Sequence, residues 1–376
     1  MRPAVAAVQR PADARLLIVD AFGRIEHAPR ARWLDWLQRG DAVVANDAAT
    51  LPASLHGVHQ RTGAPIEARL AAWRGSEAGQ GITFDAIVFG AGDWRTPTER
   101  RPPPPALAPG DAFELGPLVA TMQTALGHPR LVRLSFAMPR GAFWRGLAAH
   151  GRPVQYAHLR EPLALWDAWT PIAAQPLAFE APSAGFVLDW QTLAEMHARG
   201  IRFATLTHAA GLSTSGDLLL DARLPLDEAY RIPARTAEMV ATRAGRVIAI
   251  GTTVVRALEH AARDDGVVKS GDGIATQRIG AHTRLRVVDA LVTGTHEPGS
   301  SHHELLRAFA DDDVLTRATD ALERHRYRTH EFGDSMLVIR RNPASRRNAS
   351  VFGPVSRVAN ACAARGSAAL RETAKE

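Results

Sequence analysis

The chain of 376 residues contains a single cysteine, Cys362, near its carboxyl end. One thiol can form no internal disulfide and cannot supply the grouped thiolates of a structural zinc site, so both kinds of framework are excluded. No run of about 18 apolar residues occurs, and the first residues lack the apolar core of a signal peptide. We therefore expect a cytoplasmic protein that does not insert into a membrane.

Several catalytic and cofactor-binding motifs are absent as well. The sequence has no H-E-x-x-H, G-x-S-x-G, G-x-x-x-x-G-K or G-x-G-x-x-G pattern. Metalloprotease chemistry, a hydrolase nucleophile elbow, a phosphate-binding loop and glycine-rich dinucleotide binding thus have no support in the sequence.

Lysine is scarce, and the positive charge is concentrated at the carboxyl end. Only Lys269 and Lys375 occur among 45 basic residues, and the formal net charge is +6. Residues 341–376 carry +5 of it, which leaves the rest of the chain near neutrality. Net charge therefore gives no support for binding a polyanion. The basic tail has few large apolar residues, so we expect it to be disordered.

The remaining composition predicts two folded units, because 376 residues with 46% hydrophobic content exceed one ordinary core. Strand and helix patterns alternate in residues 1–55 and 151–340, which favours an α/β domain with a mixed or barrel-like sheet and flanking helices. Residues 56–150 show short runs of period two, which predict an inserted small antiparallel β-barrel domain. The expected strands are residues 15–20, 42–45, 201–207, 246–250, 285–292 and 336–340, with a helix at 188–199.

The stretch from Arg246 to Glu259 predicts a buried strand that turns directly into a helix. Gly251 permits a close backbone approach at the turn, and Thr252–Thr253 place hydroxyl and amide groups where a negative or electron-rich ligand group is favoured. Arg256 and Glu259 lie one helical turn apart and can reach the same neighbourhood. The alternative is a plain strand-to-helix connection with a threonine cap.

Polar residues follow four of the predicted strands. If these strands share one edge of a sheet, their loops converge, and His208 and His296 become candidates for acid–base chemistry because histidine titrates near neutral pH. Hydrogen-bonded structural histidines and an Asx turn are the alternatives. The four loops are Asn46–Asp47, Thr207–His208, Thr252–Thr253 and Thr295–His296.

Asp289 lies within an apolar run and needs a partner if it is buried. A structural ion pair with an arginine such as Arg256 is one interpretation; a carboxylate that holds a ligand's hydroxyl or ammonium group is the other. His302 and His303 are adjacent on a predicted helix and point to different sides, so this pair is not expected to bind a metal.

Taken in order, segments spanning residues 13–340 resemble the S-adenosylmethionine:tRNA ribosyltransferase-isomerase family of queuosine biosynthesis. The run GRVIAIGTTVVRALE, from Gly245 to Glu259, is the most specific of them. The other segments are residues 40–47 with 51–53, 181–185, 228–233, 287–293 with His296 and Pro298, and 327–336.

This resemblance implies an α/β domain interrupted by a small β domain, and a reaction that uses no metal or redox cofactor. S-adenosylmethionine would serve as ribosyl donor: the aminomethyl group of a 7-deazaguanine in tRNA attacks the ribose, adenine and methionine leave, and epoxyqueuosine forms. Such chemistry needs a base for a proton made acidic by the sulfonium, and donors for the departing adenine.

The resemblance also suggests roles for individual residues. His296 is the first choice for the base, with His208 and Asp289 as further catalytic candidates. Contacts to S-adenosylmethionine are expected from Gly251, Thr252, Thr253, Arg256, Glu259, Pro182, Ser183 and Gly185. Contacts to the acceptor are expected from Asn46, Asp47, Tyr230, Tyr327 and Asp334.

The chain departs from the family pattern in loops, where substrate contacts concentrate. Ala49 and Ser54 stand where the family has arginines, and Val187 replaces a histidine. Three hypotheses follow: a tRNA ribosyltransferase-isomerase, a paralogue that applies the same donor chemistry to a small-molecule acceptor, and an inactive binding protein on this scaffold. We expect a monomer in each case.

Overall fold

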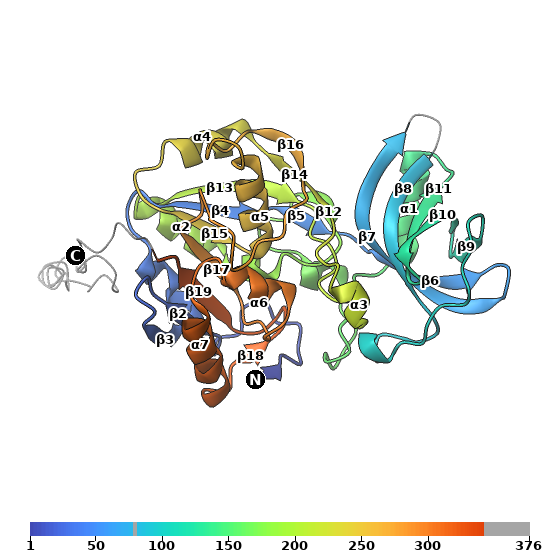
Figure 1. The fold of residues 1–376 in the computed structure, drawn as a ribbon, viewed down its shortest axis with the longest axis horizontal. Helices are drawn as coiled ribbons and strands as arrows, with labels where there is room; N and C mark the ends of the chain where they lie inside the picture. Colours follow the sequence, from blue (N-terminus) through green and yellow to red (C-terminus); the bar gives the residue numbers. More distant parts are fainter. Residues whose placement is uncertain (78–80, 342–376) are drawn as a thin grey trace, which may run out of the picture.

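A nine-stranded mixed sheet forms the centre of the larger part of the molecule (Figure 1). The computed structural model describes residues 1–77 and 81–341. The strand order is β16-β14-β13-β4-β15-β17-β19-β2-β3. The strands are β2 (Arg15–Val19), β3 (Ile25–Pro29), β4 (Ala42–Asn46), β13 (Arg202–His208), β14 (Glu228–Ile232), β15 (Val247–Ile250), β16 (Gly271–Ala275), β17 (Ala290–Gly294) and β19 (Ser335–Ile339).

Helices cover both faces of this sheet because successive residues of its strands face opposite sides. In β4, Val44 packs into one core with helices α4, α5 and α7. Val43 packs into a second core with α2 and the 3-10 helices at Arg30–Trp36 and Ser183–Val187. Two small parallel pairs complete this part: β1 (Arg2–Pro3) with β18 (Arg328–Thr329), and β5 (Ala48–Thr50) with β12 (Gln175–Ala178). The helices are α2 (Trp190–Ala198), α3 (Leu218–Asp221), α4 (Ala234–Ala241), α5 (Thr252–Ala261), α6 (Ser301–Leu306) and α7 (Asp312–Arg324); 3-10 helices span Arg30–Trp36, Leu165–Ala168 and Ser183–Val187.

Four neighbouring strands in the middle of the sheet run parallel: β13, β4, β15 and β17. Their carboxyl ends therefore lie at the same edge, as the sequence predicted for the four polar loops. In open α/β sheets this edge is where ligands usually bind.

A closed antiparallel barrel forms the second part (Figure 1). Phenylalanine side chains fill it, with Phe84, Phe113 and Phe136 from the strands and Phe143 from the helix α1 that follows them. The expected α/β domain with an inserted β-barrel is thus confirmed, while its limits at residues 56 and 150 stay a prediction. The barrel elements are β6 (Ser54–His59), β7 (Ala64–Glu77), β8 (Gly81–Phe89), β9 (Ala112–Leu115), β10 (Leu118–His128), β11 (Leu131–Phe136) and α1 (Arg140–His150), with a 3-10 turn at Thr98–Arg100.

The strand predicted for residues 285–292 is wrong at its amino-terminal end. Residues 285–289 are not in β17, which begins at Ala290. The backbone amides of residues 286–288 donate instead to the carboxylate of Glu259, at 2.7 to 3.0 Å, and so are not available for a strand ladder. The predicted disorder of the basic tail concerns residues outside the described part of the chain. Within the described ranges, no helix is long and apolar enough to cross a membrane.

Candidate active site

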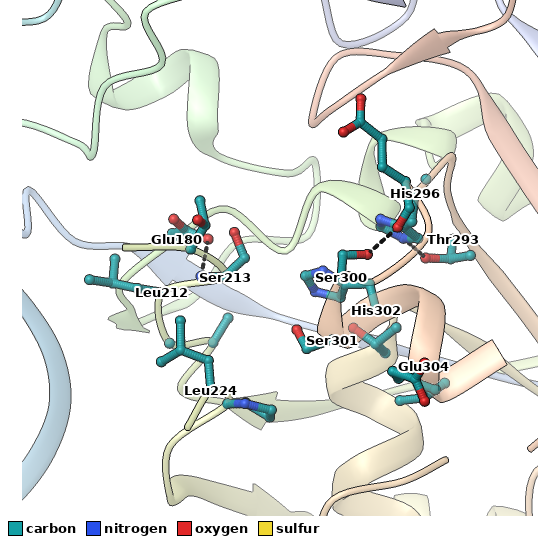
Figure 2. A pocket seen from close by; sticks show the side chains of 18 of the residues that line it. Glu180, Leu212, Ser213, Leu224, Thr293, His296, Ser300, Ser301, His302 and Glu304 are labelled. Carbon is teal, nitrogen blue, oxygen red and sulfur yellow. Dashed lines mark hydrogen bonds between the residues drawn. The ribbon is translucent and has the colours of Figure 1, made fainter. Parts of the chain in front are cut away.

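A cavity of about 1180 Å³ opens beside the carboxyl ends of β15 and β17 (Figure 2). This volume exceeds the range of about 300–1,000 Å³ that is usual for a single small-molecule site. Its walls come from residues 155–158, 180–184, 210–214, 251–253, 278–283, 293–297, 299–302 and 329–331, from Arg256 and from residues within 221–228 and 304–307, with residues 97–99 added from the barrel part.

The turn between β15 and α5 forms one wall of the cavity. Gly251 has a φ of 97°, in the left-handed region that favours glycine, and it precedes a helix of ten residues. The glycine has no side chain to cap this helix, while Thr252 and Thr253 both line the cavity. A helix start that faces a cavity provides amide donors and a positive dipole end to a ligand.

The segment predicted to contact the donor divides into a cavity-facing half and a packing half. Pro182 and Ser183 line the cavity. Gly185 does not: a Cβ at this position would lie 2.9 Å from Thr170 Cγ2, so the glycine permits close packing behind the wall. The structure therefore supports a ligand contact for the first two residues and a packing role for the third.

Arg256 is engaged by protein groups rather than exposed for a ligand. Its guanidinium forms a buried ion pair with Glu228 and donates to the carbonyls of Leu226 and Ala275. Burial lowers its pKa to about 10, which still leaves it charged at neutral pH. Glu228 also accepts from the Gly211 amide at 2.6 Å. The pair thus fixes the loop at residue 211, and Arg256 supports the wall of the cavity.

His296 lies on the wall of the cavity next to β17, as Figure 2 shows. Its Nε2 lies 2.8 Å from Thr293 Oγ1, and its ring stacks on His302 with centroids 4.7 Å apart. Burial first, and then His302 and further histidines, hold the pKa of His296 well below its usual range. The imidazole is therefore neutral at physiological pH and weak as a proton acceptor.

Glu180 lies across the cavity from His296 and was missed by the sequence reasoning (Figure 2). Its Oε2 accepts from the Ser213 amide at 3.0 Å, and only 8% of the residue is exposed. Burial raises the pKa of this carboxyl to about 7, although the hydrogen bonds from Ser213 act in the opposite direction. A carboxyl with a pKa near the working pH is suited to proton transfer. A signal was available, because Glu180 directly precedes the segment of residues 181–185.

His208 does not line the cavity and is fully buried at the end of β13. Within the described part of the chain, its ring nitrogens have no hydrogen-bond partner, and Nε2 lies 3.6 Å from Glu228 Oε2. Burial, and then Arg256, lower its pKa well below the ordinary value. The structure supports a neutral core histidine here and gives no geometric support for catalysis.

We expect this histidine to make the fold sensitive to acid. Unfolded His208 binds a proton below its ordinary pKa of about 6.5, whereas the folded state resists protonation. The free energy of unfolding should therefore fall as the pH decreases below that value. His208→Leu removes this contribution. The difference in the free energy of unfolding between the wild type and this variant should therefore change by up to about 1.4 kcal/mol per pH unit.

Urea denaturation at several pH values between neutral and mildly acidic checks this expectation. The exposed His197 of α2 provides the control, since His197→Leu should leave the pH dependence unchanged. Equal slopes for the wild type and His208→Leu would contradict the assignment of acid sensitivity to this side chain.

Asn46 and Asp47 hold the ends of β4 and β13 together. The Asn46 amide bridges both backbone groups of His208, at 2.9 and 3.0 Å, and donates to Thr253 Oγ1 at 3.4 Å. Asp47 accepts from the hydroxyls of Thr205 and Thr207. Neither residue lines the cavity, so their predicted acceptor contacts have no support in this geometry.

The other three predicted acceptor contacts also lie outside the cavity walls. The Tyr230 hydroxyl lies 2.9 Å from His260 Nδ1. Tyr327 donates to the Leu16 carbonyl, and Asp334 accepts from the backbone and side chains of Arg15 and Arg328. Their polar groups are thus used within the fold.

Glu259 and Asp289 lie at the opposite end of the strands from the cavity. Glu259 binds backbone amides of residues 286–288, so it does not reach the neighbourhood of Arg256. Asp289 accepts from the Val247 amide and pairs with Arg340 at 3.0 Å. The prediction that Arg256 is its partner is wrong, because Arg256 pairs with Glu228. Both carboxylates are structural in this geometry, and neither lines the cavity.

Comparisons of the sequence with known proteins identify a family. A family model described as a queuosine biosynthesis protein matches residues 2–338. The S-adenosylmethionine:tRNA ribosyltransferase-isomerase of Geobacter metallireducens is 31% identical over 88% of this chain and 95% of its own length. The protein of the same name from Bradyrhizobium sp. is also 31% identical, over 88% of this chain and 93% of its own.

Among solved structures, an S-adenosylmethionine tRNA ribosyltransferase from Thermotoga maritima matches 90% of this chain and 96% of its own, with 23% identity and a TM-score of 0.47. The family match and the curated relatives confirm the resemblance found in the sequence. The chain therefore belongs to the queuosine biosynthesis family of S-adenosylmethionine:tRNA ribosyltransferase-isomerases.

Proposed function

We propose that this protein transfers the ribosyl group of S-adenosylmethionine to the aminomethyl group of a 7-deazaguanine in tRNA and isomerises it to epoxyqueuosine, with release of adenine and methionine. The observation that carries this proposal is the cavity at the start of α5, in a member of this family. Its volume of about 1180 Å³ is large enough for a nucleoside donor and an acceptor base together.

Residues on the two sides of the cavity have different proposed roles in the reaction. Glu180 is the proposed base, because it is a nearly buried carboxyl with a pKa of about 7. His296 remains neutral and is the proposed hydrogen-bonding partner of the departing adenine. Thr252 and Thr253 are the proposed donor contacts at the helix start.

An assay for adenine and methionine release tests the reaction. The purified protein is incubated with S-adenosylmethionine, with and without tRNA that carries the 7-aminomethyl-7-deazaguanine. Release that depends on this tRNA supports the proposal. No release and no binding of S-adenosylmethionine would contradict it and support the inactive scaffold.

The charge of the cavity favours a second candidate, a small cationic amine as acceptor. Seven carboxyl groups and three arginines lie on its walls, and two of the arginines are paired with wall carboxylates: Arg256 with Glu228 and Arg307 with Glu304. Burial raises the pKa of Glu180 to about 7 and that of Glu331 to about 8, so the negative charge at neutral pH comes mainly from the other carboxyl groups. Such a wall attracts amines and repels phosphates. Adenine release that responds to a free 7-aminomethyl-7-deazaguanine base but not to the tRNA would establish this alternative. The acidic wall residues are Glu99, Glu180, Asp221, Glu228, Glu297, Glu304 and Glu331; the arginines are Arg256, Arg278 and Arg307.

A further inference from the structure

A cluster of two histidines and one glutamate lies on the cavity wall and takes no part in the proposed reaction. His158 comes from the segment before β12, while His330 and Glu331 follow β18. One potential ligand atom from each lies within 4.8 Å of the other two. We propose that these three side chains form a binding site for a divalent transition-metal ion of the zinc class.

Unpartnered polar atoms are the first observation behind this proposal. His158 Nε2 and Glu331 Oε2 are both shielded from solvent, and neither atom has a hydrogen-bond partner within the described part of the chain, although the Glu331 carboxyl group also interacts with the Tyr156 hydroxyl. A buried polar atom without a partner is costly, so two such atoms in one cluster indicate a missing binding partner. A cation held between them would satisfy both.

The backbone at His330 shows how the exposed third member of the cluster is brought to His158. This residue has a φ of 68°, in the left-handed backbone region that residues other than glycine rarely adopt. A turn holds it there, since the Gly333 amide donates to the His330 carbonyl at 2.9 Å. Such backbone conformations concentrate at functional sites. Here the conformation places the His330 ring on that of His158, with centroids 4.4 Å apart and planes inclined by 22°.

The chemistry of the three groups fits a zinc-type ion. Two imidazoles and one carboxylate are an established ligand set for catalytic zinc and for non-haem iron, with further positions open to water or substrate. The cavity beside the cluster provides space for the open position.

The sequence predicted no metal site because the ligands are far apart along the chain. The segment containing His158 and the turn at His330 are joined only through the fold, and no motif spacing connects them. The adjacent His302 and His303, which the sequence did not predict to bind a metal, are not part of this cluster.

Isothermal titration of the metal-free protein with Zn²⁺ tests the proposal. We expect one ion per chain, and weaker binding in His158→Gln, His330→Asn and Glu331→Gln. Asparagine tolerates the left-handed backbone at residue 330, so that variant should keep the turn. Changes outside the ligand shell already cost about 10–100-fold in affinity, so each ligand change should cost about 100-fold or more.

Titration with Co²⁺ gives a second readout, since its visible absorption reports direct coordination by the three side chains and should be lost in the same variants. The exposed His197 of α2 provides the matched control: His197→Gln should bind Zn²⁺ as the wild type does. Circular dichroism confirms that each variant is folded. A wild type that binds no Zn²⁺, or folded ligand variants that bind it with unchanged affinity, would overturn the proposal. Both readouts are independent of adenine release, so a failure of the proposed reaction would leave this result intact.

Discussion

Replacement of Arg256 by methionine is expected to lower the free energy of unfolding by about 3–5 kcal/mol. The substitution keeps most of the side-chain length but removes the charge that faces Glu228, whose side chain is 5% exposed. It also leaves the carbonyls of Leu226 and Ala275 without their guanidinium donor. Urea denaturation followed by circular dichroism measures the loss.

The exposed Arg235 at the start of α4 provides the matched control for this prediction. Arg235→Met should change the stability by no more than about 0.5 kcal/mol. Addition of Glu228→Gln to Arg256→Met should recover part of the loss, because the uncompensated charge is then removed. A loss in Arg256→Met no larger than that of the control would show that the ion pair does not stabilise the fold.

The same experiment addresses how the cavity is built. Glu228 connects Arg256 to the Gly211 amide, and two residues further on the Ser213 amide binds Glu180. The loop that holds the proposed base is therefore anchored to α5 by a buried ion pair. Arg256 was expected to bind the donor directly; its contacts instead support a positioning role.

The sequence predicted the sheet edge well because strand ends are local signals. Apolar runs that stop at Asn46, His208, Gly251 and His296 marked four loops, and parallel pairing of the strands brought them together. The direction of each side chain at such an end is not a local property. Asn46 and His208 turn into the protein, whereas His296 lies on the cavity wall.

Partners of buried charges could not be predicted for a related reason. Neither Asp289 nor Glu259 meets Arg256: Asp289 pairs with Arg340 and accepts from one backbone amide, whereas Glu259 accepts from three backbone amides. Three aligned amides satisfy a carboxylate as well as an arginine does. Glu180 and the cluster at His158 were missed because they lie in irregular segments, where periodicity carries no information.

Replacement of Glu180 by glutamine is expected to lower the rate of adenine release by about 100- to 10,000-fold, the usual contribution of a general base. Glutamine has nearly the same shape, and its amide oxygen can still accept from the Ser213 amide, so the loop should stay in place. Only the capacity to take a proton is lost. Binding of S-adenosylmethionine, measured by calorimetry, should therefore change little while turnover collapses.

A split between binding and turnover separates a base from a residue that merely shapes the cavity. Exposed Glu161 provides the control, since Glu161→Gln should leave both quantities unchanged. His296→Ala provides the comparison across the cavity: loss of a hydrogen bond to the departing adenine should slow release, with less effect than loss of the base. Normal turnover in Glu180→Gln together with abolished turnover in His296→Ala would transfer the role of base to His296, despite the burial that lowers its pKa.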